Sequence, residues 1–213
     1  MKTEDLVTML ATGVDAVNPR AAVHRYAGAV GAGVVGAAVL MAALLGVNAN
    51  LVRDASVPMV WVKFAFVTWL FGAALLATPR LGRPGASLAG MPRSLAAPVL
   101  GMWQLAAVAL GGTPRTQWPA LVFGTTAATC PFLIALLAAP VFLGGLWAMR
   151  GLAPTRLRLA GASVGLLAGA AGAFVYAFHC PELAAPFLGA WYVLGMAIPT
   201  ALGALLGPRA LRW

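Results

Sequence analysis

Long apolar stretches alternate with short polar gaps along the 213 residues of the chain. A helix needs about 20 consecutive apolar residues to cross the hydrocarbon core of a bilayer. Six stretches reach or approach that length, and the third is the shortest: 26–47, 58–78, 95–111, 125–149, 159–178 and 186–206. The pattern predicts an all-α fold, an integral membrane bundle of six transmembrane helices that forms one domain over residues 26–213.

The segment before the first stretch is different, because its apolar residues recur at helical spacing. Leu6, Leu10 and Val14 fall on one stripe of a helix, Met9 lies beside it, and the acidic residues lie elsewhere. A helix this short is marginally stable alone in water, so its apolar face needs a partner. We therefore expect residues 1–25 to be a cytoplasmic segment with a short amphipathic helix that binds another protein. A helix on the lipid surface is the alternative, although such helices are usually rich in Lys and Arg.

Composition supports the membrane assignment. The chain is 62% hydrophobic and 9% charged, with a mean hydropathy of +0.90. A soluble domain of this size could not cover such a core with polar surface, so the lipid bilayer is the expected solvent. A formal charge of +9 would suggest nucleic acid as the partner of a soluble protein. In a membrane protein the placement of the charges matters more, and no direct contact with nucleic acid is expected.

The basic residues fall almost entirely into alternate gaps between the apolar stretches. Eleven of the 14 lie on the side of the N-terminus, whereas the opposite gaps hold Arg53 and Arg115. Basic loops stay in the cytoplasm, so both termini are predicted to be cytoplasmic, and an even number of crossings agrees with this. Lys63 lies inside the second stretch, near its outer end, and we expect it to snorkel outward as an anchor.

One apolar stretch carries a ridge of small residues. They recur every four positions: Gly161, Gly165, Gly169 and Ala173. Such a ridge lets another helix approach closely. Packing inside one bundle is the favoured interpretation, and a dimer seam is the alternative. In the last stretch, Trp191 and Tyr192 fit an aromatic position at the outer membrane interface.

Candidate chemistry is concentrated in two cysteines on the predicted outer side. Cys130 lies near the outer end of the fourth stretch, and Cys180 lies just past the outer end of the fifth. A short inner loop joins these stretches, so they should be antiparallel neighbours whose outer ends could come within bonding reach. Beside Cys180, His179 and Glu182 add a borderline and a hard metal ligand to a soft thiolate. The thiols are either a reactive or metal-binding pair, with His179 as a further ligand, or small apolar residues buried in helix ends.

Catalytic patterns are missing from the sequence. It contains no nucleotide-binding signature, no Ser-His-Asp set and no paired carboxylates, so we expect neither an enzyme nor an obligatory cofactor. Its acidic residues all lie outside the apolar stretches, whereas pumps and proton relays need ionisable groups at depth. A small transporter or channel for a soft metal ion, with the cysteines as its entry site, is the alternative to a regulatory function.

Several runs carry a resemblance to a known family and together cover nearly the whole chain. They are the opening MKTEDLVTML, the pattern of Pro58, Trp61 and Lys63, Cys130, the run 153–155, YAFHCPE over 176–182, Trp191 with Tyr192, and the ending GALLGPRALRW. The chain resembles the NrsF-like family of multi-pass anti-sigma factors, which hold an extracytoplasmic-function (ECF) sigma factor at the proteobacterial inner membrane.

The resemblance implies a function for both ends of the molecule. Residues 1–25 would bind the ECF sigma factor at the bacterial inner membrane, and the residues that we expect to make this contact are Leu6, Met9, Leu10 and Val14. Cys130 and Cys180 would be required for the response to heavy metals or oxidants. We therefore expect the sigma factor to be released when the thiols are oxidised or bind a soft metal ion such as copper, cadmium or zinc.

Overall fold

A computed structural model of the chain describes residues 3–12, 21–82, 89–152 and 154–212. Regular structure within these residues is entirely helical. Six helical segments are long and apolar enough to cross a membrane: α2 (Ala21–Leu44), α4 (Pro58–Leu81), α5 (Met91–Gly111), α7 (Cys130–Arg150), α8 (Leu157–Tyr176) and the segment Ala185–Ala210. The predicted all-α membrane bundle with six spans is confirmed.

Short elements complete the chain. The sixth span consists of α9 (Ala185–Phe187), the π-helical η2 (Leu188–Tyr192) and α10 (Val193–Ala210). The remaining helices lie outside the spans: α1 (Thr3–Ala11), α3 (Leu51–Asp54), η1 (Arg115–Gln117) and α6 (Trp118–Phe123).

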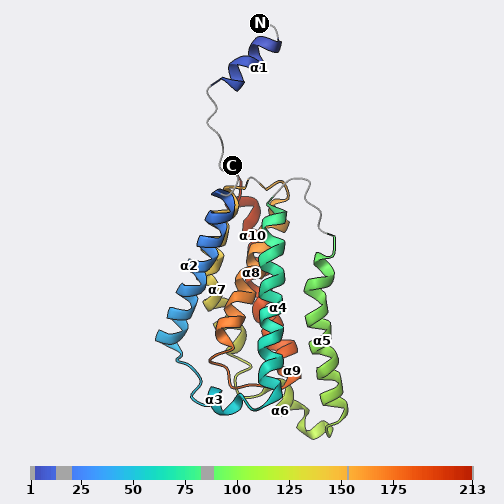
Figure 1. Ribbon diagram of the computed structural model, residues 1–213. Coiled ribbons are helices and arrows are strands. Elements are labelled where there is room, and N and C mark those ends of the chain that lie inside the picture. The colour runs from blue at the N-terminus through green and yellow to red at the C-terminus, as the bar shows by residue number, and fades with distance from the viewer. Residues whose placement is uncertain (1–2, 13–20, 83–88, 153, 213) are drawn as a thin grey trace.

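The spans run roughly side by side, and α8 lies in the middle of the bundle (Figure 1). The start of α2 and the last residues of α10 lie at the same end of the bundle (Figure 1), which we call the tail end because α1 precedes it in the chain. The short helices α3, α6 and α9 lie at the opposite end, which we call the cysteine end because α7 starts there with Cys130.

Small residues allow α8 to sit at the centre. Fourteen of its 20 residues are buried. A Cβ atom on Gly165 would overlap the carbonyl oxygen of Pro199, and one on Gly169 would lie 2.8 Å from Cα of Met196. The backbones of α8 and α10 are therefore in direct contact. The predicted ridge does bring another helix close, and that helix belongs to the same bundle.

Helix α2 packs against α7 in a similar way. A Cβ atom on Gly33 would lie 2.7 Å from Cα of Val141, and one on Gly144 would lie 2.9 Å from the carbonyl oxygen of Ala29. Helix α5 is peripheral, with three buried residues, Met91, Met102 and Ala106. The spans therefore form a tight core of α2, α7, α8 and α10, with α4 against α8 and α5 outside.

Three helix starts lie four or five residues from the sequence-based boundaries, and one of them is that of α5, which begins at Met91, four residues earlier than predicted. Helix α2 begins at Ala21, so the first turn of the span lies within the segment 1–25. Helix α7 begins at Cys130, five residues later than predicted. Gly124 adopts a φ of +49°, which an α-helix cannot contain, and Pro131 suits the first turn of a helix because it needs no amide donor there.

The contact between α8 and α10 leads to a stability prediction. Gly165→Ala should lower the free energy of unfolding by about 1–3 kcal/mol, because the new methyl group overlaps the Pro199 carbonyl. Gly72→Ala in α4 is the matched control, since nothing lies within 4 Å of its Cβ position. That control should be neutral or stabilising by up to about 1 kcal/mol. Thermal unfolding in detergent measures both, and equal effects would contradict the packing.

Candidate functional site

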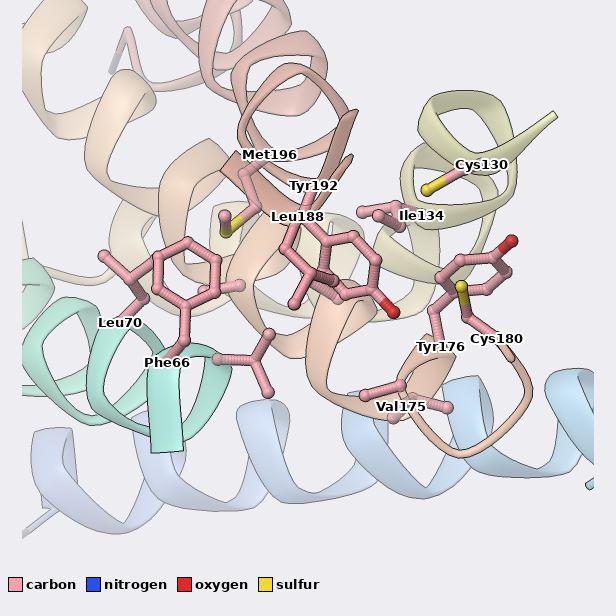
Figure 2. Packing of buried hydrophobic residues seen from close by; sticks show 14 of the residues in the cluster. Phe66, Leu70, Cys130, Ile134, Val175, Tyr176, Cys180, Leu188, Tyr192 and Met196 are labelled. Atoms are coloured by element: carbon pink, nitrogen blue, oxygen red, sulfur yellow. The ribbon is translucent and has the colours of Figure 1, made fainter. Parts of the chain in front are cut away.

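The structure brings the two cysteines into one buried cluster at the cysteine end. Cys130 is the first residue of α7, and Cys180 lies in the loop that joins α8 to α9, which we call the Cys180 loop (residues 177–184). Both side chains are 0% exposed, and both are free thiols. Figure 2 shows them at the edge of a packed group that includes Ile134, Tyr176 and Tyr192. The antiparallel pair α7 and α8 thus places the thiols together, as the short loop between them predicted.

Helix ends hold each cysteine in place. The amide of Cys130 donates to the Thr126 carbonyl at 2.9 Å, so the turn before α7 leads directly into the helix. The amide of Cys180 donates to the Tyr176 carbonyl at 3.0 Å, which continues the last turn of α8 by one residue. Pro181 cannot extend that turn, because it has no amide hydrogen.

Two tyrosines border the thiols. Tyr176 and Tyr192 belong to the same buried cluster as the two cysteines, and their rings lie 5.9 Å apart. Tyr192 is 0% exposed, so its ring packs inside the protein and does not face the lipid, unlike an aromatic belt residue. Tyr192 is the last residue of the π-helical turn η2, where the helix is wider than an α-helix. The buried hydroxyl of Tyr192 has no hydrogen-bond partner among the described residues.

Lys63 is buried at the same site. The expectation that it snorkels outward is wrong, because its side chain is 1% exposed. Its ammonium group donates to the carbonyl oxygen of Cys180 at 2.7 Å and lies 3.5 Å from that of Glu182. Desolvating an ammonium group is costly unless acceptors replace water, and these two carbonyls do so. Of the charged side chains that the structure describes, Lys63 is the buried one.

Further hydrogen bonds tie the Cys180 loop to its neighbours. The Glu182 carboxylate accepts from the amide and the hydroxyl of Thr125, each at 2.7 Å. The Phe178 carbonyl accepts from the Asn48 amide at 3.0 Å. The loop therefore contacts the segment before α7, the segment after α2, and α4.

Among the described residues, the structure does not group His179 with the two thiols as a third metal ligand. Its Nδ1 atom lies 3.0 Å from the Gly46 carbonyl, which ties the ring to the segment after α2. Within the described ranges, no group of three or more His, Cys, Asp or Glu side chains is arranged to hold a metal ion. The residues in place fit a group that needs two sulfur ligands better than a four-ligand zinc site. A disulfide, which joins two sulfurs, also matches this arrangement.

At the other end of the chain, α1 presents an uncovered apolar stripe. Leu6, Met9 and Leu10 are 38%, 61% and 66% exposed, and the helix has no buried residue. Val14, predicted to extend the stripe, lies outside the described residues. Within the described residues, the predicted apolar stripe is therefore an exposed surface of α1.

Comparison with known proteins places this arrangement in a family. A family model described as NrsF, negative regulator of sigma F, matches residues 10–213. The chain belongs to the NrsF family. It is 54% identical to the probable anti-sigma-F factor NrsF of Azospira oryzae and 35% identical to the anti-sigma-F factor NrsF of Caulobacter vibrioides, with both chains of each pair covered completely. No solved structure matches the chain.

The structure adds residues to the candidate site of this NrsF family member that sequence reasoning missed. Lys63 could have been found, because an ionisable residue inside a span is a candidate functional residue by default. Tyr176 and Tyr192 gave no such signal, since aromatic residues are common at span ends. Their position beside the thiols depends on how α8 and η2 pack.

The hydrogen bonds between Thr125 and Glu182, which hold the Cys180 loop, lead to a second prediction. Glu182→Ala should lower the free energy of unfolding by about 1–3 kcal/mol, since it removes the carboxylate oxygen that accepts both hydrogen bonds from Thr125. It should also speed maleimide labelling of Cys180 in folded protein. Glu182→Gln, which keeps one acceptor oxygen, is the control and should change both quantities less. Labelling rates that are unchanged in both variants would show that the Glu182–Thr125 hydrogen bonds do not restrain the Cys180 loop.

Proposed function

We propose that the protein is an anti-sigma factor of the bacterial inner membrane, with both termini in the cytoplasm. It holds an ECF sigma factor through residues 1–25 and releases it when Cys130 and Cys180 react with a heavy metal or an oxidant. The two NrsF relatives, named as anti-sigma factors, support the regulatory function. The arginine pattern supports the orientation.

One structural observation carries the proposal. Two thiols from separate elements meet in a buried cluster at one end of the bundle, while an apolar stripe lies uncovered on α1, which precedes the opposite end. A pair of thiols is a sensor for species that bind or oxidise sulfur, and an exposed apolar helical stripe is a typical docking surface for a protein groove. In the proposed orientation the thiols belong to the periplasmic half of the protein, where oxidants arrive first.

Oxidation or metal binding by the two thiols requires no catalytic side chain in addition to the cysteines. An oxidant that accepts two electrons converts two thiols into one disulfide and two protons, and a divalent soft metal ion displaces the same two protons. Shifting the tail from about 1% to 99% release requires about 5.5 kcal/mol of differential stabilisation. A disulfide stabilises a state by about 2–4 kcal/mol and a thiolate metal site by more, so the reaction can supply much of that difference.

A soft-metal transporter is the competing function, and the placement of the acidic residues disfavours it. All of them lie outside the six apolar stretches, so no carboxylate lies at depth to pass a cation onward. The exposed stripe on α1 also has no use in transport. Deleting residues 1–17 separates the two functions, because an anti-sigma factor then loses repression of the sigma-dependent genes, whereas a transporter loses metal flux and keeps repression.

The sensor function predicts that Cys130→Ser and Cys180→Ser each abolish induction of the sigma-dependent genes. Repression without stress should persist, because serine is close in size to cysteine. Induction should be lost, because serine forms neither a disulfide nor a thiolate–metal bond. A transcriptional reporter, measured with cadmium and with diamide, tests both variants. Ser163→Ala in α8 is the control and should be induced like the parent protein. Full induction in both cysteine variants, under both stresses, would exclude the thiols as sensors.

The docking function predicts a weaker complex for Leu10→Asp. A charge on the apolar stripe should cost about 2 kcal/mol or more, or roughly 30-fold in Kd for the sigma factor. Thr8→Asp is the control, because it adds the same charge to the same helix outside the stripe. Binding of the purified sigma factor to the membrane protein in nanodiscs measures both. Equal losses would show that charge alone matters, and no loss in Leu10→Asp would place the contact elsewhere.

A further inference from the structure

We propose that Lys63 is the positioning residue that couples the thiol pair to the base of the N-terminal segment, by holding the Cys180 loop on α4 until the thiols react. The inference rests on the proposed function and supplies the step between its two ends. Lys63 touches neither sulfur in this mechanism, and it acts through the backbone of the loop.

The hydrogen bonds of Lys63 favour two distinct arrangements of the Cys180 loop over a continuous range of positions. Its ammonium group is shut off from water and satisfied by the Cys180 and Glu182 carbonyls. If the loop moves away, the charge remains buried without acceptors unless the side chain moves as well. A small displacement of the loop therefore forces a discrete rearrangement at the start of α4.

Reaction of the thiols provides such a displacement. The two sulfurs are not bonded, and a bridge brings them to about 2.05 Å in a disulfide or onto one shared soft metal ion. Cys130 is fixed in the first turn of α7, whereas Cys180 lies in a loop without helical hydrogen bonds on its far side. Bridging therefore moves mainly Cys180, and the carbonyl that Lys63 holds belongs to that residue.

Helix α4 extends the contact to the tail end. Near its far end, the Leu75 carbonyl accepts a hydrogen bond from the Tyr26 hydroxyl at 3.0 Å. Tyr26 lies in the second turn of α2, and α2 follows directly on the N-terminal segment. One rigid helix thus touches the Cys180 loop at one end and the base of the tail at the other.

The contact between α2 and α4 is weak enough to switch. An open cleft of about 670 Å³ lies between them, lined by residues such as Val23, Val30, Phe71 and Leu75. Helix α2 is instead anchored on α7, where Arg25 donates to the Trp147 carbonyl at 2.8 Å and its guanidinium lies 4.1 Å from the Trp147 ring. Movement of α4 can therefore change the Tyr26 contact without unpacking α2 from α7.

The test separates bridge formation from response in the same cells. Diamide takes two electrons and two protons from the thiols as its N=N bond becomes HN–NH, and the disulfide is counted by maleimide–polyethylene glycol labelling after denaturation in detergent. Reporter induction is measured in parallel. In Lys63→Met we expect a disulfide with loss of induction, and in Lys63→Arg, which keeps a charged donor, we expect induction to return.

Tyr26→Phe provides a second variant, because it removes one hydroxyl at the far end of α4 and should fold normally. We expect it to form the disulfide and to lose much of the induction. Trp61→Phe is the matched control, since Trp61 donates to the Ala55 carbonyl at 2.9 Å, outside the Cys180 loop, and it should respond like the parent.

Each result distinguishes the inference from the function on which it rests. A parent protein that forms the disulfide and is not induced contradicts both. Induction of the parent, Lys63→Met and Tyr26→Phe alike contradicts the coupling role of Lys63 and leaves the sensor function intact. If Lys63→Met misfolds, as judged by its amount in the membrane, normal induction of Tyr26→Phe would still overturn the route through α4.

Discussion

The backbone contact between α8 and α10 is the constraint on which the arrangement of this protein depends. In a bilayer, lipid tails satisfy apolar side chains as well as another helix does, so helices associate mainly where their surfaces fit closely. Gly161, Gly165 and Gly169 supply that fit, because a Cβ atom at any of them would collide with α10. With α10 held so close, α8 becomes the central helix, and the other spans take positions around it.

The central position of α8 in turn creates the thiol site. Helix α8 delivers Tyr176 and the Cys180 loop to one end of the bundle, where its antiparallel neighbour α7 begins with Cys130. On the same side, η2 adds Tyr192 and α4 adds Lys63. The loop is also bound to Thr125 and Asn48, so parts of four spans meet at a segment of a few residues. A displacement of this segment can therefore reach most of the bundle.

Lys63 shows why a local interpretation of a charge inside a span can fail. A lysine one turn from a membrane surface usually reaches the polar region, and that outcome lowers its desolvation cost. Here the Cys180 loop folds over the end of α4 and offers carbonyl oxygens in place of water. The side chain thus finds acceptors inside the protein at a position where snorkelling was the expected solution. This outcome depends on a loop more than 100 residues away in sequence.

The sequence alone determined the number of spans, their approximate limits, the close approach at the ridge of small residues and the location of both cysteines at one end of the bundle. These features follow from local hydrophobicity, residue size and loop length, which are properties of neighbouring residues. Only the tertiary structure decided that Lys63 and Tyr192 are buried at the thiols, that His179 binds the Gly46 carbonyl, and that Glu182 holds Thr125. Those contacts join residues from different spans, and their geometry arises from how the helices pack rather than from any pattern along the chain.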